Sequence, residues 1–165
     1  MSNTKFPQKR EEKPEFKRGK SEYVLCPVCY SAYYDKSWHH ALSEDKHFNE
    51  IKEVKFTICP ADKMIKNKQY EGQIILENVS TIIKYDLFHL IENIGARAFH
   101  NDPMDRVISI KETENRIEVL TTENQLAVRI AKKISESFKD KMKKGWEIKY
   151  SHREDPTRII WKKVL

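Results

Sequence analysis

Three cysteines and an aspartate form the pattern in this sequence that is best suited to chemistry. Cys26 and Cys29 end the run Cys-Pro-Val-Cys, and Cys59 begins the similar run Cys-Pro-Ala-Asp, which ends at Asp62. The proline occupies the same place in both runs, so the second is a near-repeat of the first. Structural zinc sites take four ligands, supplied in pairs two to four residues apart. The spacing therefore predicts one structural Zn²⁺ ion bound by Cys26, Cys29, Cys59 and Asp62.

The fourth ligand of this predicted site has alternatives. Aspartate binds zinc through oxygen, but three histidines lie between the two cysteine runs and could replace it: His39, His40 and His47. A further alternative is that the cysteines are small buried side chains of a site that has lost its metal. An odd number of cysteines, two of them in a Cys-x-x-Cys spacing, favours metal binding over a disulfide framework.

The predicted site is expected to be structural rather than catalytic. A catalytic zinc keeps one position open for water, and thiolates weaken it as a Lewis acid. Three thiolates and a carboxylate also exceed the charge of the ion, which Lys36, Lys55 or Lys63 would partly offset. We therefore expect no enzymatic activity. The alternative is a metal-assisted nuclease using His39 and His40, although their order relative to the cysteines does not match such enzymes.

Basic residues form the second candidate site. The chain carries 31 lysines and arginines against 25 acids, a formal net charge of +6. Clustered cations of this kind contact nucleic-acid phosphates. The residues predicted to do so lie on a helix and in the loop after it: Arg129, Lys132, Lys133, Lys141, Lys143 and Lys144. The alternative is a solvated helix face.

The segments around the cysteines are predicted to be short strands. Residues 22–34, 55–59 and 72–77 are rich in aromatic or β-branched side chains. A helix is expected from about 81 to 100, because Ser80 is a suitable N-cap and apolar residues then recur about every 3.6 positions.

The last third of the chain has the clearest pattern. Alternating runs at 106–111 and 116–121 predict a hairpin. Thr122 and Gln125 then predict a capping box for a helix that reaches about 138. Two more strands follow, at 146–150 and 158–161. The order β-β-α-β-β predicts a four-stranded antiparallel sheet covered by a helix.

These patterns predict an α+β protein in three parts. Residues 1–20 are expected to be a disordered basic tail, because they are too polar to form a core. Residues 21–79 are expected to form a zinc-ribbon-like module, and residues 80–165 the α+β domain. The chain shows neither an apolar signal segment at its start nor a run long enough to span a bilayer. We therefore expect a cytoplasmic protein without a membrane partner.

The order of these features resembles that of a protein family. The quoted cysteine runs flank Trp38, and the runs at 103–111 and 116–131 follow. Over about 22–163 this resembles a group of small bacterial zinc-ribbon proteins of unassigned function. More distantly, it resembles the amino-terminal part of the large-ribosomal-subunit nuclear export adaptor of archaea and eukaryotes. In that pattern a cysteine stands where this chain has Asp62, and a glycine commonly follows each cysteine run, where this chain has Tyr30 and Lys63.

The resemblance implies a zinc ribbon beside a small α+β domain, and binding to ribosomal RNA or the large ribosomal subunit. A protein–protein adaptor whose positive charge only aids solubility is the alternative without a nucleic-acid role.

Overall fold

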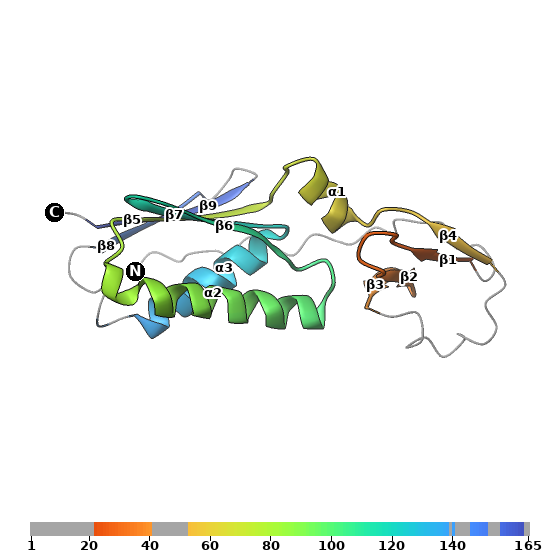
Figure 1. Cartoon of the computed structure of the whole chain (residues 1–165), viewed down its shortest axis with the longest axis horizontal. Helices are drawn as coiled ribbons and strands as arrows, with labels where there is room; N and C mark the ends of the chain where they lie inside the picture. The colour runs from red at the N-terminus through yellow and green to blue at the C-terminus, as the bar shows by residue number, and fades with distance from the viewer. Residues whose placement is uncertain (1–21, 41–52, 139, 141–145, 152–155, 164–165) are drawn as a thin grey trace.

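The computed structural model describes residues 22–40, 53–138, 140, 146–151 and 156–163, and this part of the chain is α+β (Figure 1). It has two mixed sheets and three helices. The first sheet and helix α1 form what we term the N-terminal unit, and the second sheet with α2 and α3 forms the C-terminal unit. The predicted basic tail at 1–20 lies outside the described residues.

The N-terminal unit is built on a four-stranded sheet of order β3-β2-β1-β4. Its elements are β1 (Glu22–Leu25), β2 (Ala32–Tyr34), β3 (Ser37–His39), β4 (Glu53–Phe56) and α1 (Pro60–Lys66). Strands β2 and β3 form a hairpin whose two turn residues, Asp35 and Lys36, have φ values of 49° and 68°. Two consecutive positive φ values are typical of the tight turn that suits a hairpin.

Strands β1 and β4 run parallel, and this pairing positions the cysteines. Leu25 at the end of β1 pairs with Phe56 at the end of β4. Cys26 follows the first of these strands directly, and Cys59 follows the second after two residues. Because the ends of parallel strands meet at the same edge of a sheet, both cysteine runs leave the sheet at the same place.

The C-terminal unit contains a five-stranded sheet of order β6-β7-β5-β9-β8. Its strands are β5 (Gly72–Glu77), β6 (Val107–Thr113), β7 (Arg116–Thr121), β8 (Trp146–Tyr150) and β9 (Thr157–Lys163). The predicted hairpin of β6 and β7 is confirmed, and the two later predicted strands, β8 and β9, are also antiparallel neighbours.

The prediction of a four-stranded, wholly antiparallel sheet was wrong. Strand β5, assigned from the sequence to the zinc-ribbon-like module, is the central strand of this second sheet. It pairs antiparallel with β7 and parallel with β9. Its run Ile74-Ile75-Leu76 is buried throughout, as expected for a central strand with neighbours on both sides.

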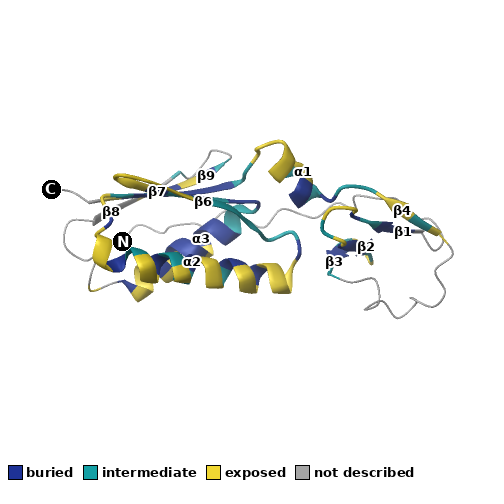
Figure 2. Cartoon of the chain, in the orientation of Figure 1, coloured by how far each residue is buried: buried dark blue, intermediate teal, exposed yellow. Residues whose placement is uncertain are grey.

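Helices α2 (Thr81–Asn101) and α3 (Asn124–Ser137) cover one face of the second sheet (Figure 1). The predicted N-cap is confirmed, since the Ser80 hydroxyl accepts a hydrogen bond from the amide of Ile82. Leu87 and Ile91 of α2 share one buried core with Leu126 and other residues of α3 and with alternate residues of the strands (Figure 2).

The predicted capping box at the start of α3 was wrong. Glu123 is the N-cap and makes no side-chain capping bond. The Thr122 hydroxyl instead donates to the carbonyl of Met104 at 2.6 Å and accepts from the amide of Arg106 at 2.8 Å. Hydrogen bonds to a loop distant in sequence thus occupy the Thr122 hydroxyl, and these bonds compete with capping of α3.

No helix in the described part of the chain combines the length and the apolar character that crossing a bilayer requires.

Candidate metal centre

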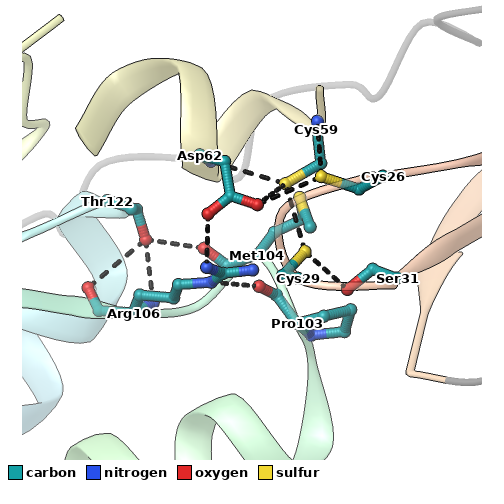
Figure 3. A network of polar contacts seen from close by, with 9 residues as sticks. All are labelled: Cys26, Cys29, Ser31, Cys59, Asp62, Pro103, Met104, Arg106 and Thr122. Atoms are coloured by element: carbon teal, nitrogen blue, oxygen red, sulfur yellow. Dashed lines mark hydrogen bonds and ion pairs between the residues drawn. The ribbon is translucent and has the colours of Figure 1, made fainter. Parts of the chain in front are cut away.

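The first cysteine run is a tight turn between β1 and β2. The amide of Cys26 donates to the carbonyl of Ser31 at 2.8 Å, and the amide of Tyr30 donates to the carbonyl of Cys26 at 2.9 Å. Tyr30 has φ 62°, a conformation that glycine adopts more readily than other residues. A tyrosine thus adopts the left-handed conformation of this turn, which places both Cys26 and Cys29 on its inner side (Figure 3).

The second run is the start of helix α1. Cys59 is the N-cap, Pro60 follows at the first helical position, and the Cys59 sulfur accepts from the amide of Asp62 at 3.4 Å. Proline is favoured at that position, and an acid in the first turn interacts favourably with the positive end of the helix dipole. The helix start therefore turns the sulfur and the carboxylate towards the same point, with aspartate in a position that suits it.

The four predicted ligands come together. One ligand atom from each of Cys26, Cys29, Cys59 and Asp62 lies within 4.8 Å of the others. Asp62 Oδ2 is 3.1 Å from both Cys26 Sγ and Cys59 Sγ, and the sulfurs of Cys29 and Cys59 are 3.7 Å apart (Figure 3).

These distances fit the dimensions of a zinc site. Bonds of about 2.3 Å to sulfur place two thiolates about 3.8 Å apart in a tetrahedron, close to the 3.7 Å between Cys29 and Cys59. A sulfur and a carboxylate oxygen on the same ion are about 3.5 Å apart by the same reasoning. The 3.1 Å contacts of Asp62 Oδ2 need only a small side-chain adjustment to reach that spacing.

A largely buried arginine lies beside the cluster. Arg106 Nη1 donates to Asp62 Oδ1 at 2.8 Å, and the two side chains are only 14% and 7% exposed. A guanidinium at this place offsets part of the negative charge of three thiolates and a carboxylate. The sequence had suggested lysines near the cysteines for this role, and nothing local marks Arg106, which is 44 residues from Asp62.

The environment of the cluster shifts the pKa of Asp62 and the pKa of Cys59 in opposite directions. Burial raises the pKa of the Cys59 thiol well above its usual value. Burial also opposes ionisation of Asp62, but hydrogen bonds from the cysteine thiols and the charge of Arg106 outweigh it and lower the pKa of Asp62. Without a metal the carboxylate is thus charged and Cys59 is protonated, so metal binding must release protons from the site.

The histidines predicted as alternative ligands are held elsewhere. His39 Nε2 is 2.9 Å from the Ser37 hydroxyl, and the ring stacks on Tyr34. His40 Nε2 bonds to the carbonyl of Phe99. Neither belongs to the cluster of ligand atoms, and His47 lies outside the described residues. The structure therefore does not contain a cluster in which His39 or His40 is the fourth candidate ligand.

Three of the predicted nucleic-acid residues lie on α3: Arg129, Lys132 and Lys133. Arg129 pairs with Asp105 at 3.4 Å and Lys133 with Glu136 at 2.7 Å, and both cations are about half exposed. Lys132 is exposed on the same helix. Three predicted contacts fall outside the described residues: Lys141, Lys143 and Lys144.

In comparisons with known proteins, no protein-family model and no curated protein matches the chain.

Proposed function

We propose that the protein is a non-enzymatic binding protein whose N-terminal unit is a zinc ribbon holding one structural Zn²⁺ ion. The observation that carries the zinc assignment is the convergence of three sulfurs and one carboxylate oxygen within 4.8 Å. Thiolate-rich sets of this kind favour zinc over the hard cations, which prefer oxygen ligands.

The donor set supports a structural role for the ion. All four positions of a zinc tetrahedron are accounted for by Cys26, Cys29, Cys59 and Asp62, so no position is kept for water. Cys26 and Cys59 are fully buried, which also keeps water and substrate away. The placement of His39 and His40 away from the sulfurs gives no support to the nuclease alternative.

Metal analysis of the purified protein tests the zinc assignment. We expect one zinc per chain, lost in a Cys59→Ser variant because a hydroxyl is a poor substitute for a thiolate. A His39→Ala variant is the matched control and should retain the ion, since His39 bonds to Ser37 instead. A chain without zinc, or a His39→Ala variant that loses it, contradicts the proposed ligand set.

We further propose that the protein associates with ribosomal RNA on the large ribosomal subunit. The support is the family resemblance, the net charge of +6 and the cations of α3. The ion pairs of Arg129 and Lys133 are exposed. Exposed pairs contribute little stability, so RNA phosphates can compete for these cations.

Cosedimentation with large ribosomal subunits at increasing salt tests this association. Binding should weaken steeply as salt rises, because each phosphate contact releases counterions. A variant with Arg129, Lys132 and Lys133 changed to glutamine should bind more weakly and with a shallower salt dependence. A control with the same charge change at exposed sites elsewhere should bind as the wild type: Lys66→Gln, Lys68→Gln and Arg97→Gln.

Two results contradict the RNA proposal. Equal weakening by both triple variants would show that only net charge matters. Absence of binding at low salt, together with a protein partner retained at high salt, would favour the adaptor alternative.

A further inference from the structure

The two oxygens of the Asp62 carboxylate have different neighbours. Oδ2 lies 3.1 Å from the sulfurs of Cys26 and Cys59, whereas Oδ1 accepts the 2.8 Å bond from Arg106 (Figure 3). One oxygen is therefore free to bind an ion while the other is held by a cation. Partners of this kind orient a ligand and tune its affinity for the metal.

Arg106 belongs to the C-terminal unit and is held there by several contacts. Its Nε donates to the carbonyl of Pro103 at 2.8 Å, and its guanidinium carbon lies 5.1 Å from the centre of the Phe99 ring. Its backbone amide donates to Thr122 Oγ1 at 2.8 Å, and its carbonyl accepts from the amide of Thr122 at 3.0 Å. These contacts hold Arg106 next to the start of β6 and the end of β7, so the place of these two strands determines where its side chain meets Asp62.

The remaining nitrogen of this guanidinium indicates a second role. Arg106 Nη2 is buried and makes no hydrogen bond in the structure. The guanidinium faces the Cys29 thiol, and Asp62, Cys29 and Cys59 all favour its charged form. A buried donor without a partner is costly, and a metal-bound thiolate beside it would accept its hydrogen bond.

Two other contacts join the units at the same place. Met104 packs against the small core of the N-terminal unit, which includes Trp38 and Cys59. His40 packs edge-on against Phe99, with 4.8 Å between ring centres. The end of α2 and the loop before β6 therefore both contact the N-terminal unit, and the loop does so next to the metal ligands.

We propose that Arg106 is a positioning residue that holds Asp62 as the fourth zinc ligand, so that zinc binding and contact between the two units strengthen each other. This inference rests on the proposed zinc site. Thermodynamic linkage makes the effect reciprocal: if contact between the units raises zinc affinity, zinc stabilises that contact by the same factor.

Zinc affinity, measured by competition with a chromophoric chelator, tests the role of Arg106. An Arg106→Gln variant should bind zinc about 10- to 100-fold more weakly, as is typical when the partner of a metal ligand is lost. Arg106→Lys keeps the charge and should recover part of the affinity. The matched control is Arg116→Gln, which removes an arginine paired with Glu118 on an exposed strand surface and should bind zinc normally.

The same Arg106 substitution in a variant that lacks Asp62 distinguishes positioning of Asp62 from a general effect of Arg106 on folding. In an Asp62→Cys variant the fourth ligand is a thiolate with no Oδ1 for Arg106 to hold. Adding Arg106→Gln should then cost clearly less affinity than it does beside Asp62. An equal loss in both backgrounds would overturn the positioning role, because it would show that Arg106 acts through the thiolates or the fold and not through Asp62.

Amide hydrogen exchange with and without zinc tests the reciprocal effect. Zinc should slow exchange of the Arg106 and Thr122 amides in the wild type, and should not do so in Arg106→Gln. Zinc that protects 22–40 but leaves these two amides unchanged would overturn the coupling and leave the zinc site intact. A wild type that binds no zinc would instead overturn both the proposed function and this inference.

Discussion

Tyr30 shows how one residue can retain a turn that its side chain disfavours. Its φ of 62° lies in the left-handed region, and the residue is 69% exposed. The left-handed conformation costs a non-glycine residue about 1–2 kcal/mol. The two hydrogen bonds between Cys26 and residues 30 and 31 hold it in place, so the cysteine turn needs the conformation but not a glycine.

A Tyr30→Gly variant should therefore be more stable than the wild type, by about 0.5–1 kcal/mol. Relief of the left-handed strain exceeds the extra entropy that glycine gains in the unfolded chain. Urea denaturation of the zinc-loaded protein measures the difference. Tyr30→Ala is the control, since it removes the ring but keeps the strained φ. A gain in stability from alanine as large as that from glycine would contradict this explanation.

At the scale of elements, strand β5 depends on one close approach. An added Cβ at Gly72 would lie 2.5 Å from the Ala127 Cβ on α3 and 2.3 Å from the Thr121 hydroxyl on β7. Glycine at this position lets α3 pack directly against the sheet. The sequence pattern of β5 does not reveal this requirement, because both neighbours are about fifty residues away in the chain.

We expect Gly72→Ala to destabilise the C-terminal unit by about 1–3 kcal/mol, the usual cost of overpacking a core. Thermal unfolding measured by circular dichroism gives the magnitude. The zinc content should stay at the wild-type value, because Gly72 does not contact the metal ligands. An unchanged melting temperature would show that α3 can shift without cost.

For the whole molecule, the two units differ in what holds them together. The core of the N-terminal unit consists of Val24, Cys26, Tyr33, Trp38, Cys59 and Ala61, whereas the C-terminal core extends over three strands and two helices. Two members of the smaller core are themselves predicted metal ligands. A core of this size gives little stability without a metal or other cross-link.

Removal of zinc by a chelator should therefore affect the units unequally. We expect hydrogen exchange to accelerate strongly in 22–40 and 53–66, while the central strands β5 and β7 stay protected by their own core. Mass-spectrometric hydrogen exchange resolves the two regions. Equal acceleration in both would show that the units unfold together and that the zinc stabilises the whole chain.

The features that the sequence alone determined depend on neighbours close in the chain. The helix after Ser80, the β6–β7 hairpin and the cysteine spacing each follow from patterns a few residues long. The same holds for Asp62, because the repeat of Cys-Pro-x-Cys as Cys-Pro-Ala-Asp marks it as the first candidate for a fourth ligand, ahead of the nearby histidines. Capping, periodicity and ligand spacing act over one or two turns of chain, so they can be seen without a tertiary structure.

Only the tertiary structure decided which distant segments meet. The central place of β5, the use of the Thr122 hydroxyl by the loop at 104–106, and the pairing of Arg106 with Asp62 join residues far apart in sequence. Apolar and charged side chains each have many possible partners, and the packing of the complete core selects among them. Local patterns therefore identified the candidate metal ligands, while tertiary packing supplied the arginine that pairs with one of them.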